Sequence, residues 1–260
     1  MTAFKDEIVQ VGSTKVRVLS GGQGEPLLFL HGASGGGKWL PVMEELAKKY
    51  HVIAPEHPGY GKSDEPEWLE EMYDLVLFYL DFMSQQKLDK VHMVGHSLGG
   101  WLAAEFAVGH WERLRSLTLV SAPGIFVEGV IPGDNFMWNR EELIRNLYYN
   151  QELADQILSQ ELSSEETEIA IKNSETTAKL VWIPRWHNPK LKKRLGRIQV
   201  PTLVVWGKED RLFSVDYAYA WEKLIPGARL AVFEECGHSP HIEKAEQFAQ
   251  QLTDFYNNIS

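Results

Sequence analysis

Short apolar runs alternate with helical patterns along most of this chain, and the alternation restricts what it can fold into. Such continuous runs are typical of strands that are buried on both faces of a sheet. Between them, apolar residues recur every three or four positions, as in an amphipathic helix. Strands that alternate with helices predict a mostly parallel α/β sheet with right-handed crossovers. The predicted strands are residues 26–30, 51–56, 90–95, 114–121, 200–207 and 228–234.

The beginning of the chain follows another pattern. Residues 5–20 alternate apolar and polar around a Gly-Ser pair, which predicts a β-hairpin. A helix is expected over residues 38–50, with Pro41 in its first turn. The other predicted helices of the alternating region are residues 69–86, 98–110, 214–225 and 244–257.

One long segment interrupts the alternation. Almost eighty residues between Ser121 and Val200 contain no strand pattern. A structureless loop of that length is uncommon in a domain, and residues 139–183 read as several helices. Residues 126–168 hold ten acids against two bases, and residues 172–197 hold eight bases against one acid. Because surface ion pairs contribute little each, this asymmetry favours two solvated faces over mutual pairing.

Charge and composition exclude several functions. The net charge is −10 and the isoelectric point about 5.4, without the basic footprint of a nucleic-acid binder or any attraction to anionic membranes. No apolar stretch is long enough for a membrane span. The single Cys236 rules out an internal disulfide. The charged start does not read as a secretory signal, so we expect a cytoplasmic protein, as a monomer or homodimer.

A serine stands at a cramped corner of the predicted sheet. Gly95-His96-Ser97-Leu98-Gly99 matches G-x-S-x-G, directly after a predicted strand and before a predicted helix. In that context the motif predicts a nucleophile elbow, a strained turn that lifts the hydroxyl above the sheet. The glycines avoid clashes at the turn. The alternative is a serine that only caps the helix.

A serine nucleophile needs a base and a carboxylate that orients the base. His238 follows the predicted strand 228–234, and Glu209 and Asp210 follow the strand 200–207. Both loops fall at carboxyl ends of parallel strands, where open α/β sheets place their sites. No acid directly follows the strand 114–121; the next one is Glu128.

These landmarks together resemble the α/β-hydrolase superfamily of the single helical cap type. The resemblance covers nearly the whole chain, through LFLHGASGGG, APEHPGYGKSD, VGHSLGG, VPTLVVWGKEDRL and CGHSPHIEKAEQF. It implies an eight-stranded sheet with helices on both faces, a core of residues 1–125 and 198–260, and a helical cap of residues 126–197. It also implies Ser97 as nucleophile, His238 as base and then acid, Asp210 as the orienting carboxylate, and no cofactor or metal.

The oxyanion of an acyl-transfer intermediate requires two prepared donors. One is expected from the N–H of Leu98, the residue after the nucleophile. By resemblance the other comes from the residue after His31-Gly32, which is Ala33, with Ser34 as the next candidate. The glycine-rich loop lacks the phosphate-binding pattern because Trp39 follows Lys38.

Several functions remain open from the sequence. The first is hydrolysis of a small hydrophobic ester through an acyl-enzyme. Lactone hydrolysis and cleavage of the carbon–carbon bond of a vinylogous diketone are alternatives, and a ligand-binding receptor is a further one. Relatives that cleave carbon–carbon bonds usually have an HGGGPG-like loop and a tryptophan soon after the catalytic histidine, which this chain lacks. Ser97 argues against the aspartate nucleophile of epoxide hydrolases and dehalogenases. His31, His96, Cys236 and His241 are expected to be structural.

Overall fold

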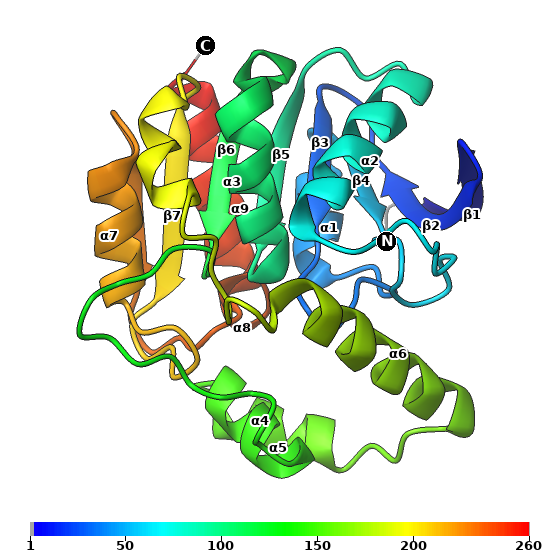
Figure 1. The fold of residues 1–260 in the computed structure, drawn as a ribbon, viewed down its shortest axis with the longest axis vertical. Coiled ribbons are helices and arrows are strands. Elements are labelled where there is room, and N and C mark those ends of the chain that lie inside the picture. Colours follow the sequence, from blue (N-terminus) through cyan, green and yellow to red (C-terminus); the bar gives the residue numbers. More distant parts are fainter. Residues whose placement is uncertain (1–2, 260) are drawn as a thin grey trace.

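Eight strands in residues 3–259, the part of the chain that the computed structural model describes, form one sheet (Figure 1). The strand order is β1-β2-β4-β3-β5-β6-β7-β8. Strand β2 runs antiparallel to both β1 and β4, and the other neighbours are parallel. The mostly parallel α/β sheet is therefore confirmed. The strands are β1 Phe4–Val11, β2 Thr14–Gly21, β3 Pro26–Leu30, β4 His51–Pro55, β5 Val91–His96, β6 Leu114–Val120, β7 Thr202–Gly207 and β8 Arg229–Phe233.

The central strands are buried on both faces because helices cover each face. In β3, Leu28 and Leu30 join one apolar cluster, and Leu27 and Phe29 join the other. This period of two follows from the pleat of a strand. The first cluster packs under α2, α3 and α7, and the second under α1 and α9. These helices are α1 Pro41–Leu46, α2 Met72–Gln85, α3 Leu98–His110, α7 Asp216–Leu224 and α9 Ala245–Asn257.

Two helical elements differ from the expectation. Helix α1 starts at Pro41, as expected for proline in a first turn, but ends at Leu46. Residues 47–50 continue in turns rather than as a regular helix. A short helix, α8 Pro240–Glu243, precedes α9 and had not been expected. Four residues are too few to give a hydrophobic period.

The insertion (residues 126–197) contains several helices, and the three longest lie in the region 139–183 where the sequence predicts them. It contains α4 Arg140–Leu147, α5 Gln151–Leu158, α6 Ser164–Val181 and two short 3₁₀ helices, Leu191–Lys193 and Leu195–Arg197. Side chains of Asn139, Asn150 and Ser163 cap the first turns of α4, α5 and α6. Figure 1 shows these three helices beyond the carboxyl ends of the parallel strands.

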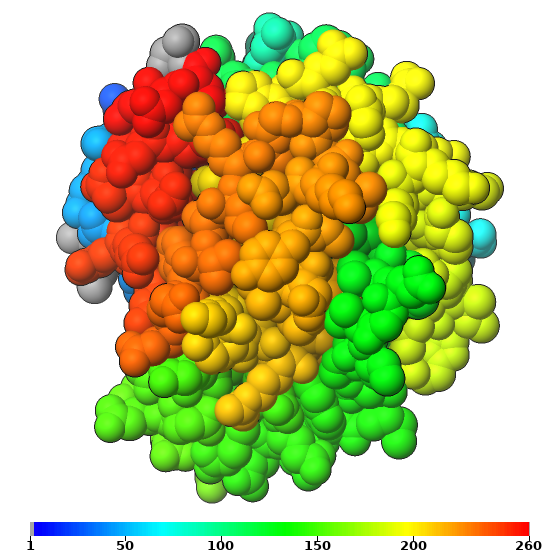
Figure 2. All heavy atoms as spheres, turned by 90° about the vertical axis from the view of Figure 1, so that its left-hand side faces the viewer, coloured from blue at the N-terminus to red at the C-terminus, as the bar shows by residue number. Residues whose placement is uncertain are grey.

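The insertion is not detached from the sheet. Leu191 and Leu195 are fully buried in the same apolar cluster as α3. Viewed from the side of α7, the green start of the insertion lies directly against the orange segment that holds α7 (Figure 2). Within residues 3–259, the ion pair that joins its acidic and basic parts is Arg185 with Asp134, at 3.3 Å. The charge asymmetry therefore mostly faces solvent.

None of the helices in residues 3–259 is at once long and apolar enough to cross a bilayer.

Two glycines of α3 allow a matched comparison of how a substitution by alanine changes the stability of the fold. A Cβ on Gly99 would lie 2.3 Å from the Leu30 carbonyl oxygen, whereas a Cβ on Gly109 would meet nothing within 4 Å. We expect Gly99→Ala to lower the free energy of unfolding by about 1–3 kcal/mol or more, because backbone must move. Gly109→Ala should raise it by up to about 1 kcal/mol, since alanine favours a helix. Urea denaturation of the two variants measures both changes; equal effects would contradict the close approach.

Candidate active site

Ser97 occupies a strained turn between β5 and α3. Its φ is 51° and its ψ −120°, which is rare for a residue with a side chain. Its N–H donates to the carbonyl oxygen of Val120 in β6, at 2.8 Å. A Cβ on Gly95 would lie 2.2 Å from the carbonyl oxygen of Gly99. The backbone therefore has the sharp strand-to-helix turn that G-x-S-x-G predicts.

His238 and Asp210 form a buried pair. The Nδ1 of His238 lies 2.8 Å from Oδ2 of Asp210, and both side chains are almost fully excluded from solvent. The other carboxylate oxygen of Asp210 accepts hydrogen bonds from the N–H groups of Leu212 and Phe213, at 2.8 and 3.0 Å. Because Nδ1 donates to this carboxylate, Nε2 of the neutral ring is the nitrogen that can accept a proton.

Glu209, the other acid of this loop, has a different partner. Its Oε2 accepts from the backbone N–H of Cys236 at 2.9 Å, and its own N–H donates to the Cys236 carbonyl. It thus ties the β7–α7 loop to the loop that holds His238. The carboxylate that accepts the hydrogen bond from the imidazole is that of Asp210.

The loops of Ser97, His238 and Gly32 converge through His96. Its Nε2 donates to the carbonyl oxygen of His238 at 3.0 Å, and the two rings lie 5.0 Å apart. A Cβ on Gly32 would lie 2.9 Å from His96 Nδ1 and 3.1 Å from Ser97 Cβ. Within the described residues, Ser97 Oγ makes no hydrogen bond to His238. Catalytic hydrogen bonds are often long without substrate and tighten when it binds.

The loop after β3 forms a turn beside Ser97. The N–H of Gly35 donates to the Gly32 carbonyl at 3.1 Å, with Ala33 and Ser34 in the middle of the turn. The backbone N–H groups of Ala33 and Leu98 make no hydrogen bond within residues 3–259. Leu98 is the first residue of α3, where helix N–H groups lack intrahelical partners. Both amides thus remain available as donors.

A chain of buried hydrogen bonds through His31, His57 and Tyr79 supports this loop. The His31 ring donates from Nδ1 to the Gly32 carbonyl at 2.7 Å and accepts from the His57 N–H at 2.9 Å. His57 donates from Nε2 to the His31 carbonyl at 3.0 Å, and its Nδ1 lies 2.6 Å from the Tyr79 hydroxyl. Burial lowers the pKa of His31 to about 4 and that of His57 well below its usual value. Both rings are therefore neutral structural groups.

Asn173 of α6, in the insertion, also holds this loop in place. Its Nδ2 donates to the Ser34 carbonyl at 3.0 Å, and its Oδ1 accepts from the Gly61 N–H at 2.9 Å. Gly35 has a φ of 96°, and a Cβ there would lie 2.7 Å from Asn173 Nδ2. Asn173, His57 and Tyr79 could not be predicted as parts of the site, because their contacts join segments that are distant in the sequence. Asn173 does not stand out in the sequence, because most residues of α6 are polar.

His241 and Cys236 are buried, and His96 is half-buried. Burial lowers the pKa of His241 to about 3 and that of His96 well below its usual value. Burial also raises the pKa of the Cys236 thiol, which disfavours the reactive thiolate. In the part of the chain that the structure describes, no three His, Cys, Asp or Glu side chains are placed to hold a metal ion.

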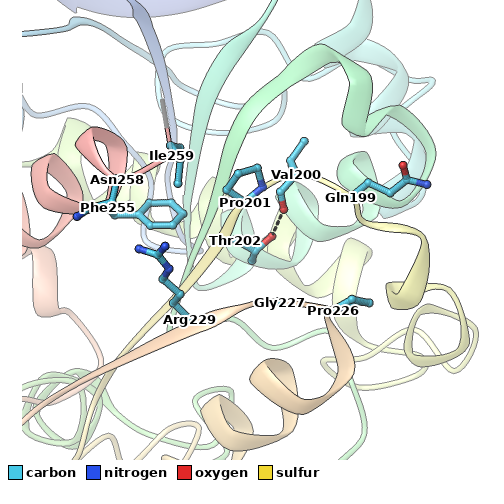
Figure 3. Close-up of a pocket in the computed structure, with 10 residues that line it drawn as sticks. All are labelled: Gln199, Val200, Pro201, Thr202, Pro226, Gly227, Arg229, Phe255, Asn258 and Ile259. Carbon is cyan, nitrogen blue, oxygen red and sulfur yellow. Dashed lines mark hydrogen bonds between the residues drawn. The ribbon is translucent and has the colours of Figure 1, made fainter.

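A surface pocket of about 370 Å³ lies elsewhere, at the amino ends of β7 and β8 (Figure 3). Thr202 and Arg229, which begin these strands, are among the residues that line it, together with Phe255 of α9. Its lining includes no residue of the Ser97, Asp210 or His238 loops. It is therefore separate from the candidate active site.

Residues 27–251 match the model of the alpha/beta hydrolase family, and the chain belongs to that family. It is 30% identical to a 2-hydroxy-6-oxo-6-(2'-aminophenyl)hexa-2,4-dienoic acid hydrolase of Metapseudomonas resinovorans, over 98% of this chain and 91% of the relative. It is 25% identical to Lipase 1 of Psychrobacter immobilis, over 89% and 77% of the two chains. A solved serine hydrolase involved in carbazole degradation superimposes with a TM-score of 0.80 at 26% identity, over 98% and 99% of the chains.

The buried histidines predict a loss of stability in mild acid. Their pKa values are depressed in the folded state, so the unfolded chain binds protons first. Stability should be full above about pH 6.5, the unfolded pKa, and should fall as the pH drops toward the folded values of about 4 for His31 and about 3 for His241. At pH 5 each contributes a loss of about 2 kcal/mol.

Urea denaturation at pH 7.5, 6.5 and 5 measures this loss before most carboxylates titrate. His241→Phe should make the dependence on pH shallower, because it removes one buried neutral imidazole. A free energy of unfolding that stays constant from pH 7.5 to 5 would contradict the interpretation.

Proposed function

We propose that this protein is a serine hydrolase that cleaves a small carboxylic ester through an acyl-enzyme intermediate. Ser97 is the nucleophile, His238 the general base and then acid, and Asp210 the carboxylate that orients the imidazole. The observation that carries the proposal is the buried 2.8 Å contact between His238 Nδ1 and Asp210 Oδ2, beside a serine in a strained elbow. This arrangement serves no evident packing purpose and matches the needs of acyl transfer.

The reaction follows from the protonation states. The Oγ–H proton of Ser97 passes to His238 Nε2 as Oγ bonds to the ester carbonyl carbon. The tetrahedral intermediate then expels the alkoxide, which takes the proton from His238 and leaves as the alcohol. Water attacks the acyl-enzyme, gives a proton to His238, and Ser97 Oγ regains that proton as the acid departs. Asp210 stabilises the imidazolium that forms twice in the cycle.

The N–H groups of Leu98 and Ala33 supply the oxyanion hole in this proposal. Both are free of other hydrogen bonds within residues 3–259 and flank Ser97 and Gly32. The positive end of the α3 dipole adds to the attraction for the developing negative charge. Ala33 is preferred over Ser34 because it directly follows Gly32, where a Cβ would lie 3.1 Å from Ser97 Cβ.

The insertion acts as a cap in this proposal and makes the site apolar. The ring centroids of Trp186 and Phe213 lie 5.6 Å apart, and those of Phe213 and His238 lie 5.8 Å apart. Trp186 thus connects the insertion to the imidazole through one aromatic ring. Such surroundings favour a small hydrophobic substrate.

Ester hydrolysis needs no catalytic group besides Ser97, His238, Asp210 and the two amides named above. Departure of an alkoxide needs one proton, which His238 provides. The HGASGGG loop and Ser239 after His238 also differ from the HGGGPG-like loop and tryptophan that carbon–carbon hydrolases usually have. A lactone, as an internal ester, requires the same groups.

Cleavage of a carbon–carbon bond is the second candidate. It is favoured by the relative from Metapseudomonas resinovorans, which is a hydrolase of a hexa-2,4-dienoic acid and aligns with 98% of this chain. Such a reaction requires a proton to be delivered to carbon rather than to oxygen.

A substrate panel separates these candidates. Esters of graded acyl length, lactones and 2-hydroxy-6-oxo-dienoates should be assayed with wild type and Ser97→Ala. We expect esters to be turned over with a burst of alcohol, and Ser97→Ala to lower kcat on the order of 10⁴-fold or more. A fluorophosphonate should label wild type but not the variant. Turnover of dienoates alone would select the second candidate, and tight ligand binding without a burst or labelling would indicate a receptor.

The roles of the two adjacent acids are tested with substitutions of equal charge change. Asp210→Asn should lower kcat by about 10³- to 10⁴-fold, because the amide no longer fixes the Nδ1–H tautomer of His238. Glu209→Gln can still accept from Cys236 N–H through its amide oxygen, and should retain most of the activity. Urea denaturation of both variants tests whether they fold. The reverse pattern would give the orienting role to Glu209.

A further inference from the structure

Glu243 in α8 is a carboxylate that the proposed mechanism does not use, and it contacts two parts of the chain. Its Oε1 accepts from the N–H of Gly237, directly before His238, at 2.7 Å. Its Oε2 accepts from the N–H groups of Tyr149 and Asn150, at 2.8 and 2.9 Å. Tyr149 and Asn150 connect α4 to α5 in the insertion. One side chain thus joins the histidine loop to the cap.

The same two segments also meet backbone to backbone. The N–H of His238 donates to the Leu147 carbonyl oxygen at 2.8 Å. A Cβ on Gly237 would lie 2.6 Å from that oxygen and 2.8 Å from Tyr149 N. The approach is therefore too close for any residue other than glycine. The position of the α4–α5 connection and that of the His238 backbone depend on each other.

Only an ionised carboxylate satisfies this set of donors. It offers two acceptor oxygens that point in different directions, and its partners are these three N–H groups and, at 4.0 Å from Oε1, the Cys236 Sγ. A glutamine has one acceptor oxygen and would turn its amide hydrogens toward at least one of these N–H groups. Burial raises the pKa of Glu243, while the hydrogen bonds from Asn150, Gly237 and Tyr149 act to lower it. Without Glu243, the N–H of the buried Gly237 would lose its partner, whereas Tyr149 and Asn150 are exposed residues.

We propose that Glu243 is a positioning residue that places His238 correctly only while the α4–α5 connection of the cap is seated on the histidine loop. Enclosure of the substrate and placement of the base thereby become one event. The inference rests on the proposed function, since it assigns His238 the role of base.

Substitution at Glu243 tests the positioning role against a purely structural one. Glu243→Gln should lower kcat about 10- to 100-fold with a much smaller change in KM, because misplacement of the base affects the transition state more than substrate binding. Glu243→Ala should lower kcat further, since alanine has no side-chain acceptor. The control is Glu246→Gln, an exposed acid in the first turn of α9, which should keep wild-type kcat. A Glu243→Gln enzyme with wild-type kcat per folded molecule, even if less heat-stable, would overturn the proposal.

A measurement on the unaltered protein decides the question if the Glu243 variants do not fold. Amide hydrogen exchange is followed in the wild type with and without a fluorophosphonate on Ser97. Residues 147–150 and residues 236–238 should become protected together, by a similar factor. Protection of the histidine loop without any change in residues 147–150 would show that the two segments move independently, against the proposal.

Failure of the proposed function gives a different result. A wild-type protein with no ester, lactone or dienoate turnover and no fluorophosphonate labelling would refute the hydrolase. An active wild type with an unaffected Glu243→Gln variant refutes only the role of Glu243.

Discussion

At the turn between β5 and α3, backbone segments approach so closely that no Cβ fits between them. Gly99 lies against the carbonyl oxygens of Leu30 and His31, and Gly95 against that of Gly99. This contact brings the end of β3 to the start of α3 and holds Gly32 next to Ser97. The positive φ of Ser97 is maintained because the sheet on one side and the helix on the other leave it no alternative. The strain is thus supported by the surrounding packing and not by any single bond.

The buried polar groups around Ser97 are held mainly by backbone. Asp210 receives two backbone N–H groups, Glu243 receives three, and the rings of His31, His57 and His96 each bond to a carbonyl or an N–H. Such partners cannot rotate away as side chains can. The loops that carry Asp210 and Gly32 are therefore held by backbone contacts, which is a condition for electrostatic stabilisation of a transition state.

The sequence was most informative where a local pattern determines a local structure. The strands follow from continuous apolar runs, and the turn at Ser97 from glycines whose spacing a sharp corner requires. Asp210 could be separated from Glu209 only by resemblance, because the two are adjacent and only three-dimensional geometry shows which carboxylate reaches the imidazole. Asn173 and Glu243 could not be assigned roles. Their partners are backbone amides and carbonyls of remote segments, and a backbone atom leaves no mark in the sequence.

The place of the insertion along the chain has a consequence for synthesis on the ribosome. Strand β6 pairs with β5 as soon as both have emerged, but its other neighbour, β7, comes only after residues 121–201. Until then the nascent chain presents an apolar open edge, the kind of surface that invites misassociation. The helices of the insertion, whose contacts are mostly local, can form during that interval. A chain stalled there would contain Ser97 but neither Asp210 nor His238, which follow β7 and β8.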